Sequence, residues 1–193
     1  MTSVLFDIYY YHYDNFMRLF KLDNHQTIIN LVKAKDPKQQ LIADVGGGTG
    51  LLADTLIKLG HEVTIIDPAK KMTQIACQRN PAIQIINKEF QRTDFVQSFD
   101  IIILRDCFHH IKDQTLILGK IFQALKKDGL VIIQEFVPLS LSSKIIFAFE
   151  RCLLEKVYPV TPAKLSEMMN QANFNSEFIF INSRDYLATG VKK

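Results

Sequence analysis

The residues best suited to chemistry are an acid and a cluster of glycines that follow a short apolar segment. Asp44 is followed by four glycines within five positions, namely Gly46, Gly47, Gly48 and Gly50. Glycine has no Cβ, so such a loop can turn sharply and let the backbone approach a ligand closely. The apolar residues 41–45 predict a buried strand, and helical spacing begins at Thr49. Strand, glycine turn and helix form the first unit of a nucleotide-binding α/β fold, with the ligand at the carboxyl end of the strand.

Two adjacent histidines, His109 and His110, are the best candidates for proton transfer. They follow the apolar segment 101–104, which places them in a loop at the same edge of the predicted sheet. A neutral imidazole at pH 7 can accept a proton from a hydroxyl or an amine. The alternative is that one or both only cap the following helix or bond to the backbone. Adjacent histidines do not share a helix face and no third ligand is evident, so the sequence predicts no metal site.

Seven apolar segments have the length and composition of strands. They lie at residues 41–45, 62–66, 83–86, 101–104, 130–136, 176–181 and 186–191. Helical patterns separate the first five, which indicates βαβ connections and a mainly parallel sheet. Only residues 182–185 join the last two, and so short a link requires antiparallel pairing. The predicted fold is a three-layer α/β/α sandwich with a seven-stranded, mostly parallel sheet and an antiparallel C-terminal β-hairpin.

Turn-forming residues predict where several of these elements begin and end. Gly60 is expected to end the helix after the glycine loop. Pro68 is expected to begin the helix after the second strand, and Thr161-Pro162 the last helix. Residues 127–129 are expected to form the turn before the fifth strand.

A single domain, residues 1–193, is the simplest organisation for a chain of this length. Its expected parts are an N-terminal helical cover at residues 1–37 and a cofactor-binding core at residues 41–137. An inserted helix or lid is expected at residues 138–160, and a last helix with the hairpin at residues 161–193. Tyr9 and Tyr13 lie on an aromatic face that either packs on the sheet edge or covers a pocket and contacts a substrate. The inserted helix could instead be a dimer face or a shallow membrane contact, but a lid is favoured because it emerges on the ligand side.

Composition narrows the class of protein. Of 193 residues, 48% are hydrophobic and 22% charged, and the net charge of +3 comes without a basic stripe, so no nucleic-acid partner is indicated. Three widely spaced cysteines predict a reducing compartment without disulfides or a zinc site, and Cys107 is expected to serve in packing. The sequence shows neither a signal peptide nor an apolar run of about 18 residues. A cytoplasmic monomer or homodimer is therefore expected.

The glycine loop fits two ligand-binding patterns. Read from Gly48, it matches the dinucleotide pattern G-x-G-x-x-G/A, with Ala53 at the last position. Read from Asp44, it resembles motif I of the class I S-adenosylmethionine-dependent methyltransferases. Further matches are the acid after the second strand, Asp67, and the acid-apolar pair after the third, Glu89-Phe90. The entry to the fourth strand, Ser98-Phe99-Asp100, and the His-His loop after it, Phe108-His109-His110-Ile111, also match. This last loop is similar to that of small-molecule members, including the quinone-biosynthesis type, although residues 126–130 lack their Pro-Gly-Gly turn.

The resemblance implies S-adenosylmethionine as cofactor, S-adenosylhomocysteine as product, and methyl transfer to O, N or C of a small-molecule acceptor. Asp67 would bind the ribose, with a helix N-cap as the alternative role. Asp44 would support the loop or reach the cationic amino group through water, and the backbone at Arg105 would accept from that group. The expected cofactor-binding residues are Asp44, Gly46, Gly47, Gly48, Gly50, Asp67, Pro68, Met72, Glu89, Phe90 and Arg105.

Two other functions stay open at this point. A cofactor-binding but catalytically silent methyltransferase-like module would fit the missing Pro-Gly-Gly turn and the lack of an assignable base. An NAD-dependent oxidoreductase depends on the second glycine pattern alone, and a dinucleotide fold would have a second parallel half in place of the hairpin.

Overall fold

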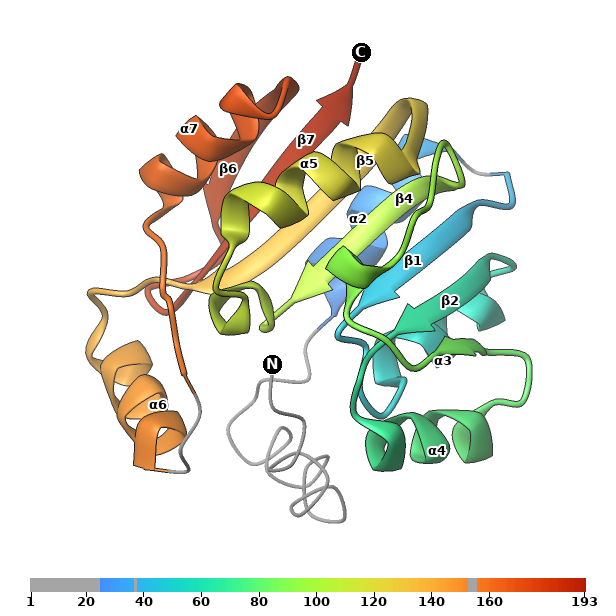
Figure 1. The fold of residues 1–193 in the computed structure, drawn as a ribbon, viewed down its shortest axis with the longest axis horizontal. Coiled ribbons are helices and arrows are strands. Elements are labelled where there is room, and N and C mark those ends of the chain that lie inside the picture. Colours follow the sequence, from blue (N-terminus) through green and yellow to red (C-terminus); the bar gives the residue numbers. More distant parts are fainter. Residues whose placement is uncertain (1–24, 37, 153–155) are drawn as a thin grey trace.

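One seven-stranded sheet organises the chain (Figure 1). The structure, a computed structural model, describes residues 25–36, 38–152 and 156–193. The expected N-terminal aromatic face with Tyr9 and Tyr13 therefore lies outside the described residues.

The strand order and directions confirm the predicted fold class. The strands are β1 (Leu41–Val45), β2 (Glu62–Ile66), β3 (Gln84–Ile86), β4 (Phe99–Arg105), β5 (Leu125–Phe136), β6 (Phe174–Phe180) and β7 (Asp185–Lys192). They lie side by side in the order β3-β2-β1-β4-β5-β7-β6. The first five pair in parallel, whereas β7 pairs antiparallel with both β5 and β6. The antiparallel end of the sheet is not the second parallel half that a dinucleotide fold would build.

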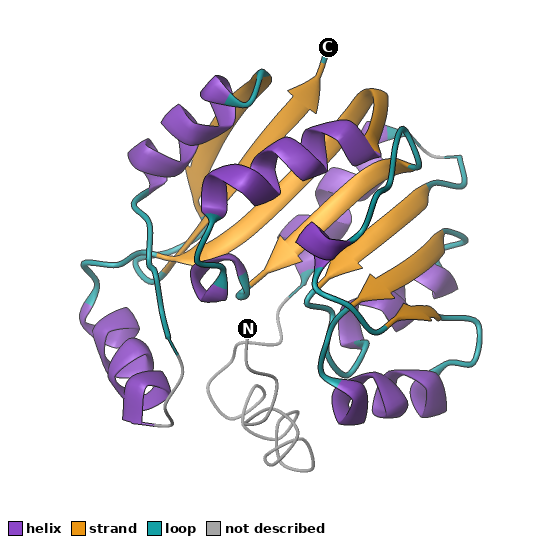
Figure 2. Ribbon diagram, viewed as in Figure 1, coloured by secondary structure: helices purple, strands orange, loops and turns teal. Residues whose placement is uncertain are grey.

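Helices cover both faces of the sheet and so form the three layers (Figure 2). They are α2 (Gln26–Lys35), α3 (Leu51–Lys58), α4 (Lys70–Arg79), α5 (Gln114–Ala124), α6 (Leu141–Cys152) and α7 (Pro162–Gln171), with 3-10 turns η1 (Phe90–Arg92) and η2 (Phe108–His110). Residues of α2, α3 and α4 pack on one face, and residues of α5 and α7 on the other. In Figure 1, α6 stands beyond the carboxyl ends of the parallel strands. None of the described helices is long and apolar enough to cross a membrane.

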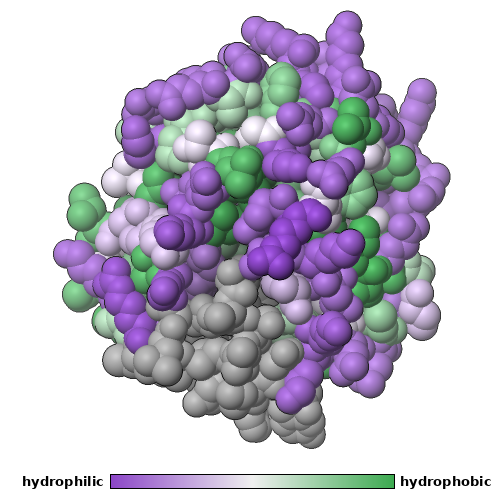
Figure 3. Space-filling model, viewed as in Figure 1, coloured by the Kyte–Doolittle hydropathy of each residue, from purple (hydrophilic) through white to green (hydrophobic). Residues whose placement is uncertain are grey.

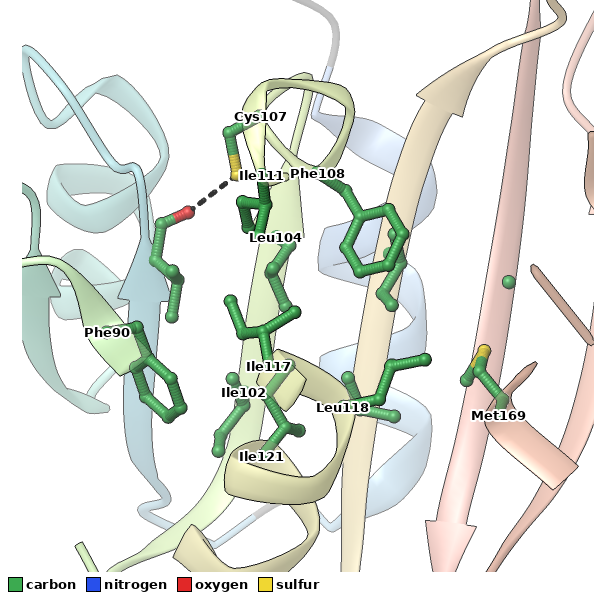
Figure 4. Packing of buried hydrophobic residues seen from close by; sticks show 14 of the residues in the cluster. Phe90, Ile102, Leu104, Cys107, Phe108, Ile111, Ile117, Leu118, Ile121 and Met169 are labelled. Carbon is green, nitrogen blue, oxygen red and sulfur yellow. Dashed lines mark hydrogen bonds between the residues drawn. The ribbon is translucent and has the colours of Figure 1, made fainter. Parts of the chain in front are cut away.

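Strand β4 is buried on both faces because its side chains alternate between two apolar layers. Ile102 and Leu104 pack toward α5, in the cluster that Figure 4 shows, while Ile101 and Ile103 belong to the opposite layer. On the molecular face in Figure 3, hydrophilic residues prevail and apolar ones are interspersed among them. The run of apolar residues in β4 therefore reflects burial on both faces, as expected for a parallel strand in the middle of a sheet.

Cys107 belongs to the core, as the sequence analysis expects. Its side chain packs in the cluster of Figure 4, and its thiol donates a hydrogen bond of 3.1 Å to the carbonyl oxygen of Val45. Burial raises the pKa of the Cys107 thiol well above its ordinary value, and neighbouring carboxylates add to this effect. The thiol therefore stays protonated at pH 7 and is not a nucleophile.

Two predicted boundaries were wrong. Helix α4 begins at Lys70 rather than Pro68, because the Asp67 carboxylate holds the backbone amide of Ala69 at 2.8 Å and keeps that segment in a turn. The expected turn at 127–129 is a bulge inside β5, which already pairs with β4 at Leu125. Asp128 has a φ of 60°, so the chain does turn locally there, but the sheet hydrogen bonding resumes on both sides.

We expect Gly50→Ala to lower the free energy of unfolding by about 2–4 kcal/mol, since a left-handed backbone and core overpacking both oppose a side chain. Gly50 has a φ of +76°, and an added Cβ would lie 2.8 Å from Cβ of Ala76 and 3.2 Å from its Cα. Helices α3 and α4 would have to separate. Urea denaturation at pH 7 measures the change.

Two other glycines serve as controls for this substitution. Gly60 has a φ of +94° and Gly119 lies within α5, and an added Cβ at either position would meet nothing within 4 Å. Gly60→Ala should therefore show backbone strain alone, and Gly119→Ala should stabilise by about 0.5–1 kcal/mol. Equal losses at Gly50 and Gly60 would show that helix packing contributes nothing at Gly50.

Candidate active site

The glycine loop has the conformation that its spacing indicates. Gly46, Gly48 and Gly50 have φ values of 71°, 53° and 76°, so every second residue is left-handed. The amide of Gly46 donates to the carbonyl of Ile66 at 3.0 Å, which ties the loop to the end of β2. The loop thus turns sharply at the carboxyl edge of the sheet, where this type of fold binds its ligands.

Asp67 fastens this loop from the end of β2. Its side chain is buried, and one oxygen accepts a hydrogen bond of 3.0 Å from the amide of Gly48 while the other accepts from Ala69. Met72 is also buried, and its methyl group lies 3.3 Å from the point where a Cβ would project from Gly48. Two cavities, of about 40 and 500 Å³, lie at this edge of the sheet, and neither side chain lines them. Their contacts with ribose and adenosine therefore stay predictions, while their support of the loop is visible.

Asp44 lies beneath the loop and is 2% exposed. Its Oδ2 atom has no hydrogen-bond partner among the described residues, and an added Cβ at Gly47 would lie only 2.7 Å from it. Burial raises the pKa of Asp44 to about 7, Arg105 opposes this rise with its positive charge, and Asp67 adds to it. A buried carboxylate oxygen with no donor is costly unless a ligand supplies one.

A small cavity of about 40 Å³ opens between the glycine loop and the end of β4. Asp44, Gly46 to Thr49, Arg105 and Asp106 line it, together with His25 at the start of α2. The backbone at Asp106 is left-handed, with a φ of 50°, and turns the chain directly after β4. The acid, the glycines and Arg105 are therefore brought together here, as the sequence analysis expects.

A larger cavity of about 500 Å³ lies on the other side of Gly46, which lines both cavities. Pro68, Glu89 and Phe90 line it, and these are three of the residues expected to bind cofactor. Lys156 and Tyr158, which follow α6, line it as well, together with His110. The volume is typical of a small-molecule pocket.

His109 is buried and bound to Glu135, the residue before the last of β5. Its Nδ1 atom lies 2.6 Å from Oε2 of Glu135, whose Oε1 accepts from the backbone amides of Phe108 and His109 at 2.7 and 3.2 Å. Burial lowers the pKa of His109, but the charge and hydrogen bond of Glu135, together with Glu150, outweigh it and raise that pKa above its ordinary value. His109 is therefore an imidazolium at pH 7 and does not line either cavity.

His110 differs from its neighbour in both charge and position. Burial, reinforced by the positive charge of His109, lowers the pKa of His110 to about 4 although Glu150 opposes the shift. It is therefore neutral at pH 7, and it lines the large cavity. Of the two histidines, His110 has the protonation state of a base and access to the cavity.

Two glutamates complete this part of the site. Glu135 lies near the end of the strand predicted at residues 130–136, but its side chain cannot be oriented from the sequence. Sequence reasoning missed Glu150 of α6, whose Oε1 lies 3.4 Å from Nε2 of His109 and 3.8 Å from Nε2 of His110. The signal was present, because Glu150 is the one acid in the largely apolar sequence of α6. The expectation that no third potential ligand accompanies the histidines was wrong.

Comparison with known proteins agrees with this geometry. A sequence profile described as "Methyltransferase domain" matches residues 13–177. An uncharacterized methyltransferase of Alkaliphilus oremlandii is 30% identical over 143 residues, which are 68% of this chain and 65% of that protein. The mitochondrial ubiquinone biosynthesis O-methyltransferase of Bos taurus is 31% identical over 110 residues, which are 52% of this chain and 30% of that protein. The chain spans less than two thirds of the length of these relatives.

A solved structure supports the same fold. The magnesium protoporphyrin IX methyltransferase of Synechocystis PCC 6803, with bound S-adenosylhomocysteine, superposes with a TM-score of 0.74 at 15% identity over 99% of each chain. At this identity the likeness concerns the fold alone.

Proposed function

Because the chain belongs to the methyltransferase domain family, we propose that it transfers a methyl group from S-adenosylmethionine to a small-molecule acceptor at oxygen, nitrogen or carbon. S-adenosylmethionine is the cofactor of this family, and when bound it supplies the methyl group on an electrophilic sulfonium. The family is established by the match over residues 13–177, whereas the reaction and the acceptor are our proposals.

The observation that carries the proposal is the unpartnered carboxylate oxygen of Asp44 beside the small cavity. A cationic amino group, such as that at the methionine end of the cofactor, would supply the missing donor and stabilise the buried charge. On the other side of Gly46, Pro68, Glu89 and Phe90 offer a wall for the adenosine. The residues present therefore fit the cofactor at both ends.

Most of the rate enhancement would come from position. Methyl transfer requires the acceptor atom in line with the bond that breaks, and a cavity that holds both molecules provides this alignment. The imidazole of His110 would accept a proton where the acceptor atom carries one. We assign no such role to His109, because its ring is charged and bound to Glu135.

The inserted segment 138–160 fits the role of a cover over this cavity. Glu150 of α6 approaches both histidines, and Lys156 and Tyr158 line the cavity. Leu139, Leu141 and Ile145 are 76%, 77% and 64% exposed, so the outer side of this segment carries exposed apolar residues. We propose that it serves as a lid in a single domain of residues 1–193.

Calorimetric titration with S-adenosylhomocysteine, combined with transfer of labelled methyl groups to an acceptor library, tests this function. We expect binding at a 1:1 ratio and labelling of at least one small molecule. His110→Gln should leave the affinity for S-adenosylhomocysteine unchanged and lower the transfer rate at pH 7 by about 10²–10⁴-fold if the acceptor loses a proton. Stabilisation by NADH in place of S-adenosylhomocysteine would contradict the proposal, and binding without any transfer would indicate a silent module.

A further inference from the structure

We propose that this chain binds a divalent ion of the zinc class between η2 and α6, through the imidazoles of His109 and His110 and the carboxylate of Glu150. One ligand atom from each residue lies within 4.8 Å of the others. The proposal does not depend on methyl transfer, since it rests on these three side chains alone.

The distances between the three side chains suit a shared ion better than hydrogen bonds. Oε1 of Glu150 lies 3.4 Å from Nε2 of His109 and 3.8 Å from Nε2 of His110. A charge-assisted hydrogen bond between such groups measures about 2.7–2.9 Å. Two ligands that each lie about 2.0–2.2 Å from one tetrahedral zinc ion are roughly 3.3–3.6 Å apart. The separation of 3.4 Å already lies in that range and the one of 3.8 Å is close to it, whereas the widest separation in the group, up to 4.8 Å, requires the side chains to close by about 1 Å.

Two buried polar atoms of this cluster lack hydrogen-bond partners among the described residues. His109 is 1% exposed, and its Nε2 atom has no hydrogen-bond partner among the described residues. The same holds for Oε2 of Glu150, whose side chain is 20% exposed. Polar atoms that lie buried without partners mark places where an ion or a water is expected. A bound cation would satisfy both atoms.

Glu135 already prepares His109 as a ligand. It accepts a hydrogen bond from Nδ1 at 2.6 Å and is itself fixed by the amides of Phe108 and His109. Metal-binding histidines almost always have such a partner on the second nitrogen, because it orients the ring and makes the ligating nitrogen more basic. With Nδ1 held by Glu135, Nε2 points to Glu150, and the ion would displace a proton from Nε2.

The set of donors selects the class of metal. Two imidazoles and one carboxylate suit zinc and related first-row ions, whereas magnesium and calcium prefer sites made only of oxygen. Three protein ligands leave at least one coordination position open, as in catalytic zinc sites. Because His110 lines the large cavity, the open position would be accessible from it, and the ion would also fasten α6 to η2. While the ion is bound, the coordinating nitrogen of His110 would not accept a proton.

Zinc titration of the full chain, freed of metal by a chelator and dialysed, tests the proposal. We expect one zinc ion per chain by elemental analysis and a dissociation constant that rises at least tenfold in Glu150→Gln and in His110→Gln. Glu135→Gln should weaken binding by about 10–100-fold, as changes of a ligand's hydrogen-bond partner do. Glu167→Gln is the matched control, because this acid is half exposed in an ion pair with Lys164 on α7 and should leave binding unchanged.

Cobalt as a spectroscopic substitute and a rescue variant exclude trivial explanations. The cobalt-loaded protein should show the visible bands of a four- or five-coordinate site without a thiolate charge-transfer band, which excludes binding by a cysteine. Glu150→His keeps a ligand at this position and should restore zinc binding. Absence of zinc binding by the wild type, or binding that survives Glu150→Gln, would overturn the proposal. S-adenosylhomocysteine binding measured in the same samples tells a failed metal site from a failed methyltransferase.

Discussion

Glu135→Ala should lower the free energy of unfolding by about 3–5 kcal/mol, because it removes one partner of a buried ion pair. Glu135 is 2% exposed, and its carboxylate holds the ring of His109 and the amides of Phe108 and His109. Alanine would leave those groups without an acceptor and open a void at the end of β5. Chemical denaturation of the metal-free protein at pH 6 measures the loss.

Glu135→Gln separates charge from hydrogen bonding at this position. The amide oxygen can still accept from Phe108, but the side chain no longer stabilises the imidazolium of His109. Because the pKa of His109 is higher in the folded protein than in the unfolded chain, protonation of His109 stabilises the fold fully below the unfolded pKa of about 6.5. This stabilisation is lost as the pH rises through the folded pKa. The stability difference between wild type and Glu135→Gln should therefore be largest below about pH 6.5 and shrink at alkaline pH. A difference independent of pH would show that His109 is neutral in the wild type.

Local spacing predicts the glycine loop well because its conformation depends on residues within the segment. The expected strands at 41–45 and 62–66 coincide with β1 and β2, and the alternate glycines are left-handed. Each of these features follows from steric limits on single residues and from burial of an apolar run. Where a partner strand decides the outcome, as at the start of β5, the same reasoning placed a turn inside a strand.

The two histidines show why sequence reasoning could not assign the site in full. They are adjacent and of one type, yet His109 is charged and His110 neutral because Glu135 contacts only the first through a short hydrogen bond. Glu135 and Glu150 come from β5 and α6, and no spacing rule tells which way their side chains point. The protonation state of each histidine is therefore determined by groups that distant elements place beside it, and not by the residue type.

Asp67 shows the same limit for a single carboxylate. Its position at the end of β2 agrees with the prediction, but both oxygens bind backbone amides, those of Gly48 and Ala69. A carboxylate has about four acceptor positions. Sequence alone cannot tell which donors fill them, because the donors belong to the loop geometry.

Asp44→Asn should weaken binding of S-adenosylhomocysteine by roughly 10–100-fold while it stabilises the ligand-free protein. The binding loss corresponds to one hydrogen bond between charged groups, about 1.5–3 kcal/mol. The gain in stability follows because Oδ2 of the buried carboxylate lacks a donor among the described residues, whereas the neutral amide avoids the cost of a buried charge. Calorimetry and thermal denaturation at pH 8 measure the two effects.

The pH dependence of stability should identify Asp44 as the source of this effect. Burial raises its pKa from 3.8 to about 7 in the folded state, so its protonated form is favoured on folding. The contribution of Asp44 to the free energy of unfolding is complete below its unfolded pKa and is lost as the pH rises to about 7. For a shift of this size, that contribution is on the order of 2–4 kcal/mol. Asp44→Asn should therefore gain most stability above pH 7 and little near pH 4.

Asp100 is the matched control, because its carboxylate accepts from the amide of Leu41 and pairs with Lys126, so Asp100→Asn should destabilise the protein. A ligand that binds more weakly to a more stable variant is the combination expected when a binding site, rather than the fold, requires the buried acid.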